Sequence, residues 1–279
     1  MKSFISEDDI EQAICNRLSL PEYGWKRIEC DARVEAQDDV STTGRANPSE
    51  CILPDVFLAA LKRLNPQVEE GVLQGILRDF RKDYTATDMV ETNYKLYNQL
   101  RNGIKKPVRK NGKEDFDIVR LIDFDHPERN DFHCVNQMWI KGHYRYRRPD
   151  VLLFVNGLPV VFIELKNSTV KVEESYNKNL TSYRKDIPNI FSFNQICVLS
   201  NGLQTKIGAW NSRYEFFFEW LRVDNEKEKL DRVQIAEHGL SIQNLIDGLF
   251  RKDCLLDYIE NIIFFDNKRI KIIAKNHQY

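Results

Sequence analysis

The chain has 279 residues, of which 42% are hydrophobic and 30% charged, a composition that excludes intrinsically disordered and fibrous proteins. Its 41 basic and 42 acidic residues give a net charge of −1, which argues against coating of nucleic acid through bulk charge but leaves room for a local basic groove. No apolar run approaches the roughly 20 residues of a transmembrane helix, and six scattered cysteines without a CxxC pair indicate a reduced, cytoplasmic protein with no membrane contact.

The first half of the chain is predicted to be mostly helical. Ser6 and Asp9 form a capping-box pattern ahead of an apolar stripe, which predicts a first helix. This acidic start does not fit a signal peptide. The polar segment Ala36–Glu50 predicts a loop. Three more helices follow from the apolar spacing, over Asp55–Leu64, Glu69–Phe80 and residues 86–100.

From Phe116 onward the spacing becomes that of strands. Short β-branched or aromatic runs bounded by Gly, Asn or Pro predict strands over Phe116–Phe124, Asp131–Ile140, Val151–Val155, Val160–Leu165, Gln195–Leu199 and Thr205–Ile207. A helix over Val172–Lys185 interrupts them, and helices return over Ser241–Phe250 and Lys252–Phe265. The order predicts an α/β (α+β) fold with a mixed central β-sheet flanked by helices, in one domain.

Two basic segments stand out against the balanced charge. Residues 101–113 hold six Lys or Arg and no acidic residue, which we interpret as a solvated loop. Residues 141–148 (KGHYRYRR) hold four more, with Tyr144 and Tyr146 between them, and are either an exposed strand or a nucleic-acid contact. By position, three arginines of this segment are the best candidates for contacts to DNA phosphates: Arg145, Arg147 and Arg148.

The most informative stretch is RPDVLLFVNGLPVVFIELKN, residues 148–167. It predicts a strand, a turn at Asn-Gly, and a return strand. The first strand, Val151–Val155, is wholly apolar and therefore buried on both faces. At the end of the return strand, Glu164 and Lys166 are two residues apart and so share a face.

The register of this hairpin decides whether Asp150 joins Glu164 and Lys166. A plain two-residue loop leaves Asp150 opposite Ile163, on the wrong face. One extra residue, in a three-residue loop or in a bulge at Pro159, which cannot donate to the ladder, places Asp150 opposite Glu164. We predict the register with the extra residue.

Two carboxylates and a lysine on one face suit metal-dependent hydrolysis. Asp150 and Glu164 offer the oxygen ligands that Mg²⁺ prefers, with Mn²⁺ as a substitute. Such an ion activates a bound water and polarises a phosphodiester oxygen. Lys166 could orient that water or offset the charge that develops on the phosphorus. The alternative is an Asp at a strand end and an exposed Glu–Lys pair with no chemical role.

This stretch resembles the PD-(D/E)xK nuclease core, and more narrowly the N-terminal endonuclease region of type I restriction enzyme R subunits. The likeness continues in the same order through residues 135–142 (VNQMWIKG), 183–202 (YRKDIPNIFSFNQICVLSNG) and 249–266 (LFRKDCLLDYIENIIFFD). It implies a restriction-endonuclease-like core with three catalytic residues, of which the first two are metal ligands: Asp150, Glu164 and Lys166.

The resemblance also implies a domain organisation. The nuclease domain spans residues 1–265, with a mostly helical part over 1–113, a sheet core with the active site over 114–215, and a helical part over 216–265. Residues 266–279 would then connect it to an ATP-dependent motor. The chain contains no GxxxxGK[ST] phosphate-binding motif, so we expect a nuclease fragment without its motor, in which ATP has no site.

One departure from the family concerns its Gln-x-x-x-Tyr motif, which helps to position DNA. Here it reads Asn179-Leu-Thr-Ser-Tyr183, on a helix where i and i+4 share a face. The resemblance implies DNA-binding roles for Asn179 and Tyr183, with an amide one methylene shorter. Alternatively, Tyr183 belongs to a buried stripe with Tyr176 and Leu180. Some related nucleases bring a first-helix Glu to the metal, but we interpret Glu11 as an exposed surface residue.

The resemblance implies partners as well as chemistry. The substrate would be double-stranded DNA, cut without intrinsic sequence recognition, and the methyltransferase and specificity subunits would bind through the full-length R subunit. Two alternatives stay open. One is a catalytically silent scaffold that keeps the nuclease fold for docking on the motor or methyltransferase, which the shorter amide of Asn179 favours. The other is a free-standing repair nuclease of the same fold.

Overall fold

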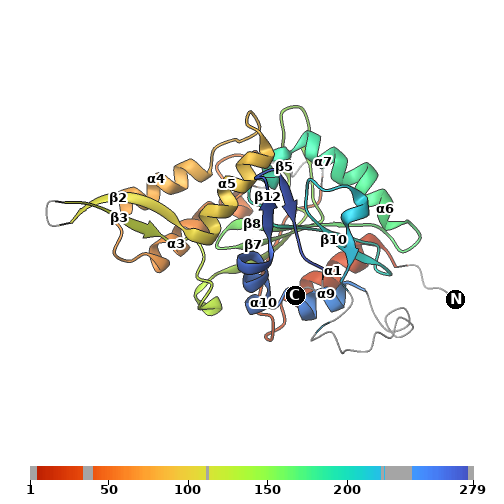
Figure 1. The fold of residues 1–279 in the computed structure, drawn as a ribbon. Helices are drawn as coiled ribbons and strands as arrows, with labels where there is room; N and C mark the ends of the chain where they lie inside the picture. The colour runs from red at the N-terminus through yellow and green to blue at the C-terminus, as the bar shows by residue number, and fades with distance from the viewer. Residues whose placement is uncertain (1–4, 34–39, 111–112, 221–222, 224–240, 276–279) are drawn as a thin grey trace.

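The computed structural model of the protein describes residues 5–33, 40–110, 113–220, 223 and 241–275. Its centre is a seven-stranded sheet in the order β1-β4-β7-β8-β9-β10-β11, with helices on both sides (Figure 1). The strands of this sheet are β1 (Lys26–Glu29), β4 (Phe132–Asn136), β7 (Val151–Val155), β8 (Leu158–Leu165), β9 (Ile196–Ser200), β10 (Thr205–Gly208) and β11 (Phe218–Glu219).

The sheet is mixed, as the sequence predicts. β1 runs parallel to β4 and β8 runs parallel to β9, whereas the other neighbouring strands are antiparallel. The predicted fold class is therefore confirmed. The two edge strands were not predicted: β1 lies in the part expected to be mostly helical, and β11 lies in the helical C-terminal part. Both are short and lack the apolar alternation that indicates a strand.

The helices of the first half agree closely with prediction. In α1 the Ser6 hydroxyl accepts from the Asp9 N–H at 3.1 Å, and the Asp9 carboxylate accepts from the Ser6 N–H at 3.1 Å, so the predicted capping box is present. The helices are α1 (Glu7–Leu18), α2 (Val40–Thr43), α3 (Pro54–Leu64), α4 (Glu70–Phe80), α5 (Met89–Asn102), α6 (Val172–Glu174), α7 (Thr181–Asp186), α9 (Ile242–Gly248) and α10 (Lys252–Asp257). Short α2 lies in the predicted loop, of which residues 36–39 are outside the described part.

The basic segment 101–113 is not a loop, so this prediction was wrong. β2 (Ile104–Lys110) pairs along its length with β3 (Lys113–Val119), and the hairpin extends from one end of the molecule (Figure 1). The strand was missed because its charged residues hide the alternation by which strands are identified. The predicted strand Phe116–Phe124 correspondingly ends early and belongs to this hairpin, not to the central sheet.

Two predicted helices are interrupted. Between α6 and α7 the chain takes a π-helical turn over Ser175–Leu180. After α10 a second π-helical turn, Tyr258–Ile262, leads into β12 (Phe264–Asp266), which pairs with β13 (Ile270–Ile272). The helix predicted over Lys252–Phe265 therefore ends early, because short apolar runs fit a strand as well as a helix.

The β12–β13 hairpin packs firmly on the body of the protein. Lys271 of β13 is buried, and its ammonium donates to the Asn194 carbonyl at 2.5 Å and to Gln195 Oε1 at 2.8 Å. Burial lowers the pKa of this ammonium well below its ordinary value. Within the described residues, no helix is both long and apolar enough to cross a membrane.

Two separate hydrophobic cores cover the two faces of the central sheet. Polar functional groups are therefore expected at the ends of its strands. Alternate residues of β7 point to opposite faces. Leu153 packs in the core that contains α1, α3, α9 and α10, whereas Leu152 and Phe154 pack with residues of α7. Because both faces are covered by apolar side chains, the polar side chains of the central strands lie at the strand ends, as Asp150 and Glu164 do.

The turn between β7 and β8 depends on Gly157. This residue has φ of +80°, and a Cβ there would lie 2.6 Å from the Leu53 carbonyl oxygen and 2.8 Å from the Phe57 nitrogen. We expect Gly157→Ala to lower the free energy of unfolding by more than about 3 kcal/mol, since the strained φ adds to the overlap with α3.

Urea denaturation followed by circular dichroism measures this effect. The matched control is Gly71→Ala in α4, where nothing lies within 4 Å of the added Cβ. That variant should keep its stability or gain up to about 1 kcal/mol, because alanine is the better helix former. Equal stabilities of the two variants would contradict the role assigned to Gly157.

Candidate active site

The site begins with the register of β7 and β8. The turn pairs Val155 with Leu158, but the register shifts by one residue beyond Pro159. The shifted pairing continues to Val151 and Ile163, so the next pair places Asp150 opposite Glu164. The predicted register is confirmed, and its cause is a bulge beside a proline that cannot donate to the ladder.

The three predicted catalytic residues meet at this end of β8. The Asp150 carboxylate accepts from the Leu165 N–H at 2.7 Å. The ammonium of Lys166 lies 3.4 Å from Glu164 Oε1 and donates to the Leu165 carbonyl at 2.7 Å. Lys166 is also 3.7 Å from Glu7 Oε1 of α1. The sheet thus holds two carboxylates and a lysine in one place.

Burial sets the electrostatics of the two acids. It raises the pKa of Asp150 to about 7. It also raises the pKa of Glu164 well above its ordinary value, and the neighbouring Asp150 carboxylate adds to the rise. Glu164 Oε2 is buried and has no hydrogen-bond partner within the described part of the chain. A buried glutamate and a half-buried aspartate repel each other here, and one glutamate oxygen is unpaired. A bound cation would stabilise such groups.

Asn179 and Tyr183 approach the same place from the helical segment. Asn179 Nδ2 donates to Glu164 Oε1, so the shorter amide still reaches this carboxylate. Asn179 lies in the π-helical turn over Ser175–Leu180. Tyr183 donates to the Arg148 carbonyl at 3.1 Å, and its ring packs edge-on against Phe162. Tyr183 is therefore a core residue beside the site; DNA contacts by these two residues stay predictions.

A groove of about 640 Å³ opens beside Asp150, and Glu11, predicted from the sequence to lie on the surface, is one of the residues that line it. Glu11 of α1 lines this groove with a side chain only 4% exposed. It accepts from Asn136 Nδ2 at 2.9 Å and from Gln137 Nε2, and burial raises its pKa. Its interpretation as a surface residue was wrong. Ile14 and Cys15, three and four residues on, are both apolar and would have placed Glu11 beside the packed stripe.

The three arginines before Asp150 have different surroundings. Arg147 forms an ion pair with Asp186 of α7 at 2.5 Å. Arg148 lines the groove, lies over the Trp139 ring at 5.2 Å and donates to a backbone carbonyl of the Ala32 segment. Arg145 is exposed in a turn. Of the three arginines predicted to contact phosphates, Arg148 thus lies in the groove, whereas Arg147 is already paired with Asp186.

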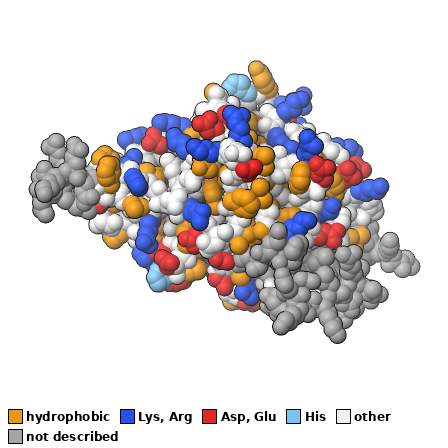
Figure 2. All heavy atoms as spheres, viewed as in Figure 1, with side chains coloured by type: hydrophobic (Ala, Val, Ile, Leu, Met, Phe, Trp, Pro, Cys, Tyr) orange, Lys and Arg blue, Asp and Glu red, His pale blue; other side chains and the backbone are white. Residues whose placement is uncertain are grey.

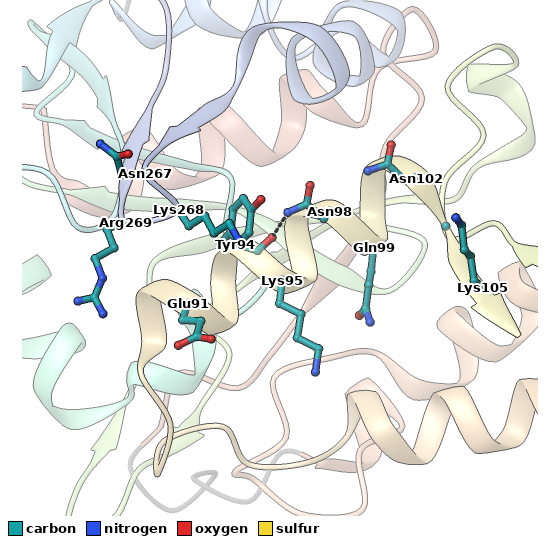
Figure 3. Close-up of a pocket in the computed structure, with 11 residues that line it drawn as sticks. Glu91, Tyr94, Lys95, Asn98, Gln99, Asn102, Lys105, Asn267, Lys268 and Arg269 are labelled. Carbon is teal, nitrogen blue, oxygen red and sulfur yellow. Dashed lines mark hydrogen bonds between the residues drawn. The ribbon is translucent and has the colours of Figure 1, made fainter.

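A second groove, of about 680 Å³, lies between α5 and the β12–β13 turn (Figure 3). Lys95 and Gln99 extend to one side of α5, whereas Asn98 and Asn102 extend to the other. Glu91 is the one carboxylate among the residues that line it. A metal-dependent site needs more acidic oxygens than this groove provides. Within the described ranges, the surroundings of Asp150 and Glu164 included, no cluster of three or more His, Cys, Asp or Glu is arranged to hold a metal ion.

Known proteins resemble this chain over most of its length. It matches the family described as type I restriction enzyme R protein N terminus over residues 4–216. It is 32% identical over 284 residues to the type I restriction enzyme HindI endonuclease subunit of Haemophilus influenzae, covering 99% of this chain and 26% of that protein.

A second relative is the putative type I restriction enzyme MjaIXP endonuclease subunit of Methanocaldococcus jannaschii. It is 31% identical over 254 residues, covering 84% of this chain and 24% of that protein. The chain therefore spans about a quarter of the length of these relatives. From these matches and the geometry of Asp150, Glu164 and Lys166, the chain belongs to the family of type I restriction enzyme R protein N-terminal regions.

Proposed function

We propose that this chain is the nuclease module of a type I restriction enzyme R subunit and that it hydrolyses phosphodiester bonds of double-stranded DNA with a divalent metal ion. One observation carries the proposal. The half-buried Asp150 and the buried Glu164 face each other beside Lys166, and Glu164 keeps one buried oxygen unpaired. A structural ion pair would leave no such oxygen, because buried polar atoms normally find partners.

The hydrogen bonds suggest which oxygens would hold the ion. Asn179 and Lys166 both donate to Glu164 Oε1, which leaves Oε2 for a metal. The Leu165 N–H engages Asp150 Oδ2, which leaves Oδ1. Mg²⁺ fits this oxygen set, with Mn²⁺ as a substitute. When bound, the ion would lower the pKa of a water and polarise a phosphodiester oxygen.

The remaining residues have roles that follow from their positions. The Lys166 ammonium lies beside the acids, where it can hydrogen-bond the attacking water or balance charge on the phosphorane. Asn179 orients the Glu164 carboxylate. Glu11 adds a further carboxylate to the groove beside Asp150, held in place by Asn136. Arg148, in the same groove, is the arginine best placed for a DNA phosphate.

The wider assignments rest on family membership. We propose that the module cuts without base recognition of its own, that methyltransferase and specificity subunits assemble with the full-length R subunit in the cytoplasm, and that ATP acts on motor domains outside this chain. The scaffold alternative was favoured by the shorter amide of Asn179. Its hydrogen bond to Glu164 removes that argument, so the catalytic proposal is the stronger one.

Calorimetric titration of Mn²⁺ tests the proposal, with and without a short DNA duplex. We expect saturable binding that weakens at least about tenfold in Asp150→Asn and in Glu164→Gln, because each loses a charged ligand. The matched control is Glu29→Gln, which changes an exposed carboxylate of the same groove and should bind as the wild type does. Binding that is absent under both conditions, or indifferent to the two site substitutions, would favour the scaffold.

A further inference from the structure

A short hairpin immediately precedes the active-site strand. β5 (Ile140–Lys141) pairs with β6 (Tyr146–Arg147), and residues 142–145 form its tip. Tyr144 at this tip is 93% exposed, more than any other large apolar side chain that the structure describes. Figure 2 shows a histidine, hydrophobic side chains and Lys or Arg together at the projecting upper edge of the molecule. A large ring held in water on a projecting tip is available to a ligand.

The hairpin is fixed in position. The Gly142 N–H donates to the Arg145 carbonyl at 2.8 Å and closes the tip. A Cβ at Gly142 would lie 1.6 Å from the Asp186 carbonyl oxygen, so the hairpin lies directly against the end of α7. Arg147 pairs with the Asp186 carboxylate at 2.5 Å. Because α7 also carries Tyr183 of the site, the tip is held at a set distance from the catalytic carboxylates.

A row of cations and rings connects the hairpin to the groove beside Asp150. The Lys141 ammonium lies 5.6 Å from the Tyr146 ring centre, Tyr146 meets Trp139 edge-on at 6.5 Å, and the Arg148 guanidinium lies 5.2 Å from the Trp139 ring. Arg148 itself lines the groove. Cations beside aromatic rings are the surface that proteins use against a nucleic-acid backbone and its bases.

From these observations we infer that the β5–β6 hairpin inserts Tyr144 into the DNA duplex, where its ring stacks on a base next to the phosphodiester to be cut. The inference rests on the proposed nuclease function and deepens it. Lys141 and Arg145 flank the ring and contact phosphates on either side. Stacking suits a nuclease without base recognition, because every base offers a π face. A protein partner is less suited, since the row has a cation at each end and no carboxylate between them.

Insertion of a ring has a consequence for substrate preference. Unstacking costs less at flexible TA steps and at mismatches than in rigid sequence. The chain should therefore bind a duplex with a central TA step or mismatch more tightly than one with a central A-tract. Tyr144→Ala should lose this preference, because the remaining contacts to phosphates do not depend on the DNA sequence.

A duplex with 2-aminopurine next to a central TA step provides the test. The 279-residue chain is titrated at low salt with EDTA, to prevent cleavage, until the DNA anisotropy saturates. We expect the 2-aminopurine fluorescence to rise with the wild type and with Tyr144→Trp. With Tyr144→Ala we expect no rise and about tenfold to a hundredfold weaker binding. Phe216→Ala, which removes another exposed ring at the far end of the sheet, is the matched control and should behave as the wild type.

The outcomes separate this inference from the proposed function. Equal fluorescence and affinity for Tyr144→Ala and the wild type, or no fluorescence change at saturation in the wild type, would overturn the inference. So would a loss confined to binding of a protein subunit, which would identify the tip as a docking surface. Loss of Mn²⁺ binding in Asp150→Asn tests the nuclease function by itself, and Tyr144→Ala should leave Mn²⁺ binding unchanged.

Discussion

Glu164→Gln is expected to lower DNA cleavage by at least about a thousandfold, and Lys166→Met by about a hundredfold to a thousandfold. Glutamine at position 164 removes the charge that would hold the metal while preserving size and the hydrogen bond from Asn179. Methionine at position 166 keeps the packing of the lysine stem and removes the ammonium beside Glu164. Glu164→Gln should fold, because it removes a buried charge. Lys166→Met leaves Glu164 without its neighbouring cation, so its circular dichroism spectrum is compared with that of the wild type before activity is measured.

The measurement is conversion of supercoiled plasmid to nicked and linear forms by the R subunit that carries this chain. Lys178→Met is the matched control, since Lys178 is next to Asn179 in sequence but pairs with Glu174 at the surface. It should cut at the wild-type rate. Should Lys166→Met retain more than about a tenth of the wild-type rate, the ammonium would have no part in the chemical step.

The second large effect is a coupling between pH, metal and stability. In the metal-free protein the pKa of Asp150 is raised to about 7, and the pKa of Glu164 is also raised well above its ordinary value. The folded state therefore keeps protons that the unfolded state has lost. Stability is greatest below the ordinary carboxyl pKa and falls as pH rises through the raised values. Each pH unit between the unfolded and folded pKa of a carboxyl costs about 1.4 kcal/mol.

A divalent ion should reverse this dependence, because it binds the deprotonated pair. Thermal unfolding from about pH 5 to about pH 8 is expected to show a falling midpoint in EDTA, and stabilisation by Mn²⁺ that grows with pH. In Asp150→Asn, the unfolding midpoint in EDTA should depend less on pH and should be higher than that of the wild type at high pH. Mn²⁺ should no longer raise the midpoint of this variant. An unchanged slope in Asp150→Asn would show that Asp150 does not titrate as described.

The structural features that the sequence predicted correctly depend on residues that are close together in the chain. The capping box of Ser6 and Asp9 forms because its groups lie within one turn of the chain. The register of β7 and β8 was predictable for the same reason: Pro159 is adjacent to the turn, and its missing N–H forces the bulge locally. The meeting of Asp150, Glu164 and Lys166 follows from that register, so the sequence predicted how the candidate active site is assembled.

Only the tertiary structure decided which side chains surround that centre. Glu11 is buried because α1 packs on the sheet, and Asn136 and Gln137, 125 and 126 residues away, donate to it. By sequence, Arg147 is as good a candidate for a phosphate contact as Arg148. In the fold, however, α7 comes close enough for Asp186 to pair with Arg147. Such pairings depend on which surfaces meet after folding, and the spacing of residues along the chain carries no information on that. The sequence by itself therefore determined that Asp150, Glu164 and Lys166 meet, and long-range packing determined which neighbouring charges lie free beside them.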